Sequence, residues 1–358
     1  MAPRGCVTFA GANRSERRLP RVMLPVPALS PIPATILATI VSTLVVGILL
    51  RASARLPHAA PSARSLHVRP TPRVGGLAIW AGFVPAALLS PSALPGGSTW
   101  AYAFAGITLV SLADDWRGVP PIVRLAVHFA AAIAVSVAVV APGSDAGPAE
   151  AVLIGALALA IVWSANLFNF MDGSDGLAGT AALCGFAACG AATAVAGGSS
   201  GDCFALCGAI LPFLVVNAPP ARTFMGDVGS VPLGFLAGAF GIAGVQGGTW
   251  PAWFPLLVFL PLIADATATL AWRYFRGERV SEPHRSHYYQ RLNRLGAGHR
   301  GTLALYGALS IAVALTALAV LVFGPAYGWS ALFAWIALLA GIFTGIDYHW
   351  SRFTGASP

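Results

Sequence analysis

Long apolar stretches alternate with short polar connections along most of the 358 residues. Most of these stretches reach the length of about 20 residues that a helix needs to cross the hydrocarbon core of a bilayer. A β-barrel would instead show shorter strands of alternating polarity. The pattern predicts an all-α, polytopic transmembrane bundle of about 10–11 spans. We place them near residues 31–51, 74–93, 98–113, 121–141, 150–167, 177–197, 203–218, 229–246, 251–272, 302–323 and 328–347.

The spans form one continuous block, with no internal repeat and no polar region long enough for a soluble domain. We therefore expect a single integral membrane domain over residues 23–350 and a short tail over residues 351–358. Residues 1–22 contain five arginines and lack an apolar run, so they do not resemble a signal peptide. We interpret them as an N-terminal extension and expect translation to begin at Met23.

The basic residues, all of them arginine, predict the orientation of the bundle. If the first span runs from outside to inside, sixteen of the 21 arginines lie on cytoplasmic connections or span ends. Such an excess of positive charge marks the cytoplasmic side. We expect a multi-pass protein of the cell inner membrane, in contact with membrane lipids, whose functional face points to the cytoplasm. The net charge of +8 then reflects orientation, and no nucleic-acid partner is expected.

Carboxylates gather on this basic side. Only 9% of the residues are charged, yet six of the nine aspartates fall at or near predicted cytoplasmic span ends. An aspartate in mid-membrane costs about 2.5–3.5 kcal/mol, and intramembrane carboxylates are commonly functional. Acidic groups in an otherwise basic face suggest a divalent metal site opposite bound phosphates. The six residues are Asp114, Asp115, Asp172, Asp175, Asp227 and Asp265.

Two polar motifs carry most of these carboxylates. In "SLADDWRG", Asp114 and Asp115 end the third span, and a cation would relieve their mutual repulsion. A solvated span end is the plain alternative. In "NLFNFMDGSDGLAG", the glycines allow backbone amides to approach a ligand, and a helix N-terminus favours anions. For Asp175 the alternative is a helix N-cap. The polar residues of this second motif are Asn166, Asn169, Asp172 and Asp175.

A third motif and a basic loop complete the pattern. In "TFMGDVGS", Asp227 suits Mg²⁺, which binds one or two carboxylates together with water and substrate phosphates. The loop after Trp272 contains seven arginines and three histidines. Its segment His284–His287 offers fork-shaped donors and imidazoles for a diphosphate, although anionic lipid headgroups are an alternative partner. One chemistry uses every element: Mg²⁺-assisted phosphoryl transfer involving a lipid substrate.

The ordered motifs "PTPRVGG", "LADDWRG", "NLFNFMDGSDGLAG", "TFMGDVGS" and "EPHRSHYYQRL" resemble those of the polyprenyl-phosphate N-acetylhexosamine-1-phosphate transferases, glycosyltransferase family 4. The resemblance covers the chain from about residue 30 onward. It implies that undecaprenyl phosphate accepts a sugar-1-phosphate from a UDP-N-acetylhexosamine and that UMP is released. The product would begin the synthesis of O-antigen or another cell-envelope glycan, as in lipopolysaccharide biosynthesis.

The resemblance also implies roles for individual residues. Asp227 would be the principal Mg²⁺ ligand, with Asp115 or Asp172 as a further ligand and Mn²⁺ as a substitute ion. Asp114 would engage or deprotonate the acceptor phosphate, beside Asp115. The remaining implied residues are His284 and His287 for catalysis, Arg124 and Arg285 for phosphate, and Asn166, Asn169, Asp172, Asp175, Asn217 and Phe224 for the nucleotide sugar.

Several alternatives stay open at this point. The run H-R-S-H lacks the adjacent histidines of phospho-N-acetylmuramoyl-pentapeptide transferases, which favours the surface-polysaccharide branch. An ion-coupled transporter would place its carboxylates near the midplane and within repeats, and the chain shows neither pattern. The sequence leaves open which sugar is used and whether the protein forms a homodimer.

Overall fold

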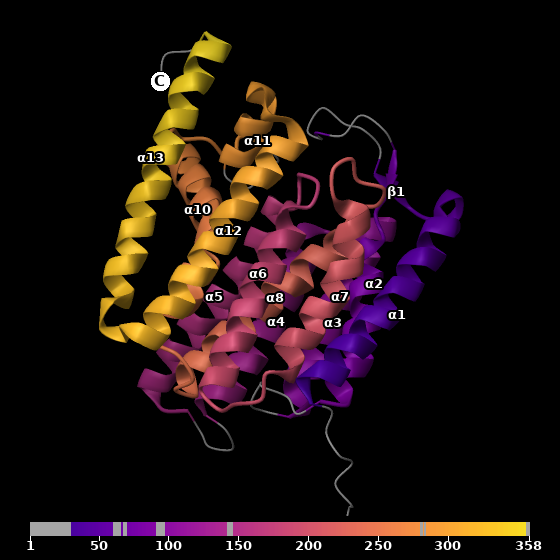
Figure 1. Cartoon of the computed structure of the whole chain (residues 1–358), viewed down its shortest axis with the longest axis vertical. Coiled ribbons are helices and arrows are strands. Elements are labelled where there is room, and N and C mark those ends of the chain that lie inside the picture. The colour runs from indigo at the N-terminus through magenta and orange to yellow at the C-terminus, as the bar shows by residue number, and fades with distance from the viewer. Residues whose placement is uncertain are drawn as a thin grey trace, which may run out of the picture.

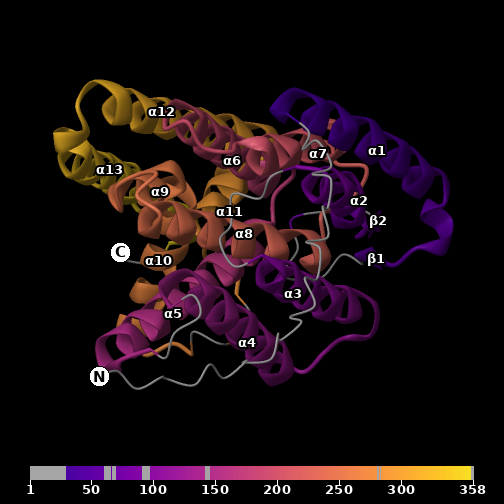
Figure 2. The same cartoon turned by 90° about the horizontal axis from the view of Figure 1, so that it is seen from below.

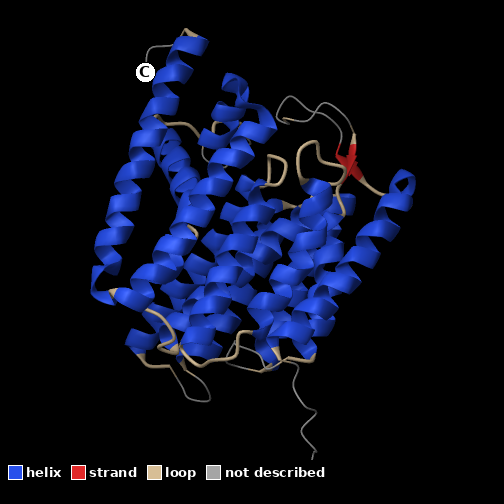
Figure 3. Ribbon diagram, in the orientation of Figure 1, coloured by secondary structure: helices blue, strands red, loops and turns tan. Residues whose placement is uncertain are grey.

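The computed structural model describes residues 30–59, 66, 70–90, 97–141, 146–279, 282 and 284–355. The expectations for residues 1–22 and for a start at Met23 lie outside these residues. Within them, helices form almost the entire chain (Figure 3). Two-residue strands, β1 (His58–Ala59) and β2 (Thr71–Pro72), pair antiparallel. The prediction of an all-α bundle is confirmed.

Each predicted span corresponds to helical structure. The helices are α1 (Pro31–Arg51), α2 (Gly75–Leu88), α3 (Ser98–Arg117), α4 (Pro121–Val140), α5 (Pro148–Met171), α6 (Leu177–Val195), α7 (Gly201–Asn217), α8 (Asp227–Gln246), α9 (Trp253–Val258), α10 (Leu260–Phe275), α11 (Tyr288–Leu292), α12 (Gly298–Phe323) and α13 (Gly328–Thr354). A π-helical segment, Asn293–Ala297, joins α11 to α12. Single 3₁₀ turns, Ser53–Arg55 and Pro325–Tyr327, follow α1 and precede α13.

Seven helical stretches of the described residues are long and apolar enough to cross a membrane. They contain α1, α4, α5, α6, α8, α12 and α13. The helices α2 and α7 are apolar but shorter, with 14 and 17 residues. Together these helices make a multi-pass membrane protein.

Proline and glycine residues set several helix ends. Pro31, Pro121 and Pro148 stand in the first turns of α1, α4 and α5. There the missing N–H of proline removes a donor that would have no helical partner. Gly118, at a φ of 69°, ends α3 in a backbone conformation that other residues rarely adopt.

The predicted span over residues 251–272 is not a single helix, because the chain forms α9 and α10 there. The helical path breaks at Phe259, which has φ −102° and ψ 11°. Pro261 follows in the first turn of α10. Its ring fixes φ and clashes with the preceding turn, so one unbroken helix through this point is unfavourable.

Helix α8 runs through the middle of the bundle, as the end-on view shows (Figure 2). Of the residues in its most apolar segment, 83% are buried inside the protein, compared with 22% for the corresponding segment of α1. Small residues permit this close packing. A Cβ added to Gly234 would lie 2.3 Å from the carbonyl oxygen of Ser164 on α5, and one added to Gly76 would lie 2.4 Å from the Cα of Gly229. The central helix is thereby fixed against α5 and α2.

One end of the bundle collects the polar loops. In Figure 1 the β1–β2 pair, α11 and the C-terminal end of α13 lie at the upper end. Contacts and a shared cavity place the aspartates at positions 114, 115, 172, 175 and 227 together at this end. Asp265 instead lies inside α10 and is fully buried. The expected gathering of carboxylates is therefore found for five of the six; that this end faces the cytoplasm stays a prediction.

Candidate functional site

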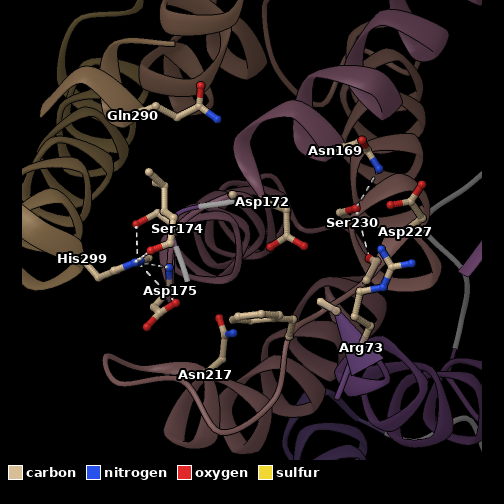
Figure 4. A pocket seen from close by; sticks show the side chains of 15 residues that line it. Arg73, Asn169, Asp172, Ser174, Asp175, Asn217, Asp227, Ser230, Gln290 and His299 are labelled. Atoms are coloured by element: carbon tan, nitrogen blue, oxygen red, sulfur yellow. Dashed lines mark hydrogen bonds and ion pairs between the residues drawn. The ribbon is translucent and has the colours of Figure 1, made fainter. Parts of the chain in front are cut away.

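A cavity of about 200 Å³ opens among the polar loops at this end. Figure 4 shows the Asp172 carboxylate in its middle, between Asp175 and His299 on one side and Arg73 and Asp227 on the other. The lining comes from β1, the segments before and after β2, the helices α5, α7, α8, α11 and α12, and the loops that follow α5 and α7. It comprises Ala59, Leu66, Arg73, Asn169, Asp172, Gly173, Ser174, Asp175, Asn217, Phe224, Gly226, Asp227, Ser230, Gln290 and His299.

Two of the sequence motifs fold together to form one wall. Residues 72–76 of "PTPRVGG" run beside residues 223–226 of "TFMGDVGS". Phe224 N donates to Pro72 O at 2.8 Å, and Gly75 N and Gly76 N donate to the carbonyls of Phe224 and Met225, each at 2.9 Å. This pairing brings the Arg73 side chain to the beginning of α8.

Asp227 and Asp114 share one arginine. Arg124 Nη1 donates to Asp227 Oδ2 at 3.2 Å and also to Asp114 Oδ2. Val119 N holds the second oxygen of Asp114 at 2.7 Å. The first turn of α4 thus places a guanidinium between carboxylates of α3 and α8. An incoming phosphate at Asp227 would meet this positive charge.

Asp115 has a structural contact with the start of α8. Its side chain is 1% exposed, and its Oδ2 accepts a hydrogen bond from Val228 N at 2.9 Å. Arg73 Nη2 lies 3.5 Å from the other oxygen. A carboxylate at this place satisfies a free N–H of the first helical turn and interacts well with the helix dipole. Asp115 therefore fixes the position of Asp227, which begins α8.

The loop after α5 adds a third carboxylate to the cavity. Asp172 directly follows the last residue of α5. Burial raises the pKa of Asp172 well above its usual value, and the neighbouring carboxylates Asp227, Asp115 and Asp175 raise it further. Both effects disfavour the ionised form. A bound cation would offset this repulsion.

Asp175 connects loops and does not cap a helix. The residue before α6 is Gly176, at a φ of 74°, and no side chain caps this helix. Asp175 Oδ2 accepts from Ala221 N at 2.9 Å, and its Oδ1 lies 3.3 Å from His299 Nδ1. The N-cap alternative is thus replaced by contacts to the 218–226 connection and to α12.

Asn217 and the two asparagines of α5 have separate environments. Asn217 accepts from Gly176 N and donates to Thr223 O, both at 2.9 Å, so its amide links two cavity loops. Asn169 lines the cavity and lies 3.4 Å from Ser230 Oγ. Asn166 donates back to Val162 O within α5 at 2.8 Å. Among the described residues, it lies outside the cavity lining.

The H-R-S-H segment lies beside the cavity lining and does not form part of it in the described structure. The His287 side chain is 4% exposed, and its Nδ1 lies 3.4 Å from Asp265 Oδ1. His284 Nδ1 contacts Ser286 Oγ at 2.9 Å, and Arg285 is exposed. Burial, with the nearby His287 and Arg273, lowers the pKa of His284 to about 4. The catalytic and phosphate-binding roles of these residues stay predictions.

Several cavity residues were missed by the sequence interpretation. His299 Nδ1 lies 3.1 Å from Asp175 N and 3.2 Å from Ser174 Oγ. Gln290 and Ser230 also line the cavity. His299 belongs to the His-containing basic loop, but nothing in its local sequence distinguishes it. Arg73 lies within "PTPRVGG", and that motif was the one signal that pointed to it.

The carboxylates suit a magnesium ion whose remaining ligands would be water and substrate phosphates. In the described part of the chain, no three His, Cys, Asp or Glu side chains form a ready metal cluster. Mg²⁺ does not require one, because it commonly binds one or two protein carboxylates and takes its other ligands from water and phosphates. Asp172 and Asp227 line the same cavity and supply such oxygens.

Comparisons with known proteins identify the family of this chain. Residues 98–245 match the profile described as Glycosyl transferase family 4. A decaprenyl-phosphate N-acetylglucosaminephosphotransferase of Mycobacterium tuberculosis is 30% identical, over 68% of this chain and 70% of the relative. The undecaprenyl-phosphate alpha-N-acetylglucosaminyl 1-phosphate transferase of Escherichia coli K12 is 29% identical, over 72% and 74%. A probable undecaprenyl-phosphate N-acetylglucosaminyl 1-phosphate transferase of Bacillus subtilis is 29% identical, over 69% and 72%. The chain therefore belongs to glycosyl transferase family 4, the polyprenyl-phosphate N-acetylhexosamine-1-phosphate transferases.

Proposed function

We propose that this protein transfers a sugar-1-phosphate from a UDP-N-acetylhexosamine to undecaprenyl phosphate and releases UMP. One observation carries the proposal: Asp172, Asp227 and Arg73 meet in one cavity at the end of a membrane bundle, and Arg124 contacts Asp227. The names of the three relatives favour N-acetylglucosamine or a related sugar as the donor group. The lipid-linked product would begin O-antigen or other envelope glycan synthesis.

The reaction exchanges one phosphoanhydride for another. A phosphate oxygen of the acceptor attacks the phosphorus that bears the sugar, and the bond from this phosphorus to the oxygen of UMP breaks. The acceptor phosphate is already largely ionised at neutral pH, since the second pKa of a phosphomonoester is about 6. We therefore assign Asp114 to holding Arg124, which engages the acceptor phosphate, and do not require Asp114 to remove a proton.

Asp227, together with Asp172, would hold Mg²⁺, and Mn²⁺ would substitute for it. The bound ion would neutralise phosphate charge during transfer. The chain's own contribution is to position the donor. Asn169 and Ser230 offer polar groups beside Asp227, and Phe224 offers a ring on the wall that residues 72–76 and 223–226 form. Arg73 adds a guanidinium at the same wall.

A second cavity suits the chain of a polyprenyl acceptor. Its volume is about 310 Å³, and mostly apolar side chains of α5, α8, α9 and α10 line it. Phe168 belongs to this apolar cavity, whereas the next residue, Asn169, belongs to the polar one. A lipid tail in the apolar cavity would thus place its phosphate near the polar one. With the arginine distribution, this supports a site at the cytoplasmic face of the inner membrane.

A nucleotide-release assay tests the proposal. The purified protein is incubated with undecaprenyl phosphate and Mg²⁺ and with a panel of UDP-sugars that includes UDP-N-acetylglucosamine. UMP should appear only when both substrates are present. Release of UDP would indicate ordinary glycosyl transfer, and the absence of nucleotide release with every donor would contradict the proposal.

A further inference from the structure

Tyr289 of α11 contacts the chain on both sides of Asp172, at the last turn of α5 and at Gly173 in the loop that follows. Its ring is fully buried, and its hydroxyl donates to the carbonyl oxygen of Phe170 at 3.0 Å. The same hydroxyl lies 2.1 Å from where a Cβ on Gly173 would stand. Phe170 precedes Asp172 by two residues, and Gly173 follows it. The position of the Asp172 carboxylate therefore depends on where Tyr289 is held.

Asp265 of α10 fixes Tyr289 in turn. Its carboxylate is 0% exposed and accepts hydrogen bonds from Tyr288 N and Tyr289 N, each at 2.9 Å. Tyr306 of α12 donates its hydroxyl to the same carboxylate. Two consecutive N–H groups at a helix start have no helical partners of their own. The buried carboxylate satisfies them and so determines where α11 begins.

His287 packs against the same group of residues. Its ring stacks on Phe170, with centroids 6.0 Å apart, and on Tyr289, with centroids 5.9 Å apart. Its Nδ1 faces Asp265 at 3.4 Å. The last turn of α5 is thus held by an aromatic stack as well as by the Tyr289 hydroxyl.

We propose that Tyr289 is a positioning residue for the loop that carries Asp172, and that Asp265 holds Tyr289 in place. This inference rests on the proposed function for its kinetic consequence but not for its structural one. Tyr289 acts through the loop and does not touch the substrates. The buried segment around His287 then serves to orient the donor site.

The neighbouring Tyr288 provides a matched control. Its hydroxyl donates to Asp347 of α13 at 3.1 Å, and its ring stacks on Phe343. Tyr289→Phe and Tyr288→Phe each remove one buried or half-buried hydroxyl from the same short helix and keep the ring. Only the first change releases the carbonyl of Phe170.

Hydrogen–deuterium exchange of the full-length protein in detergent tests the structural part. Loss of one buried hydrogen bond should speed exchange of the 170–176 amides about fivefold in Tyr289→Phe. Tyr288→Phe should leave these amides at the wild-type rate. Equal exchange in the two variants would overturn the proposal. If the wild type releases no UMP with any donor, the proposed function fails, while this comparison still decides the positioning role.

Kinetics and a double variant test the functional part. Tyr289→Phe should raise KM for the UDP-sugar about five- to tenfold and leave KM for undecaprenyl phosphate unchanged. Gly173→Ala should have a similar effect, because its new Cβ meets the Tyr289 hydroxyl. In the double variant that clash is reduced, so the two effects should be less than additive. Equal effects on both KM values, or full additivity, would contradict the positioning role.

Discussion

Arg124 Nη1 lies 3.2 Å from Asp227 Oδ2, across the contact between the first turns of α4 and α8. The same guanidinium nitrogen donates to Asp114, so one cation joins three helices at the cavity end. The side chains of Arg124 and Asp227 remain 32% and 27% exposed, which leaves both accessible to a ligand. We regard this contact as the point where the acceptor phosphate enters.

Replacing Arg124 should reduce transfer more than it reduces stability. Arg124→Lys keeps the charge but replaces the guanidinium, whose Nη1 contacts both carboxylates, with an ammonium of different geometry. We therefore expect kcat/KM to fall about tenfold. Arg124→Gln should lower it about a hundredfold. The exposed Arg117 is the control, and Arg117→Gln should stay close to wild type. Equal losses for Arg117→Gln and Arg124→Gln would remove the specific role of Arg124.

Asp227→Asn should abolish most of the activity in a folded protein. The change removes a carboxylate that lines the cavity and contacts Arg124, while the size of the side chain stays nearly the same. We expect kcat to fall about 10²–10³-fold. The partly exposed ion pair contributes little to stability, at most about 1 kcal/mol, so the melting temperature should change slightly. Near-normal turnover would exclude Asp227 as the principal metal ligand.

Removal of divalent ions should silence the enzyme reversibly. Asp172 and Asp227 supply oxygen ligands of the type that Mg²⁺ prefers. After EDTA treatment and removal of the chelator, Mg²⁺ or Mn²⁺ should restore UMP release, whereas Ca²⁺ should do so poorly because its coordination is larger and less regular. Turnover that persists in excess chelator would count against the metal site.

His284 should make the protein less stable as the pH falls. Its pKa of about 4 in the fold lies below the ordinary value of 6.5, chiefly because of burial. Between these values the unfolded chain binds more protons, so stability is present above about pH 6.5 and is lost as the pH falls toward 4. The melting temperature of wild type should therefore drop more steeply in this window than that of His284→Gln. Parallel curves would contradict the assigned environment of His284.

The sequence predicted the helices because hydropathy identifies segments that are buried in a bilayer. It predicted the clustering of five aspartates because the number of membrane crossings between two motifs decides whether both lie at the same end of the bundle. It missed the break at Phe259, because an average over a whole span hides one interrupted turn. It also grouped Asp265 with the aspartates near span ends, although this carboxylate accepts hydrogen bonds from the start of α11 from inside α10.

The remaining site features depend on contacts between distant parts of the chain. Tyr289 reaches Phe170 over 119 positions, and His299 reaches Ser174 over 125. No local pattern records such pairings. The N-cap alternative for Asp175 shows the same limit, since the partner of its side chain, Ala221, is 46 positions away.

The central claim is that the sugar moves together with its phosphate. UDP-N-acetylglucosamine carrying an isotopic label at the β-phosphorus tests it directly, with undecaprenyl phosphate as acceptor. The account predicts that the label appears in the lipid product, in equal amount to the unlabelled UMP that is released. Label recovered in free UDP, with an unlabelled glycolipid, would contradict the account.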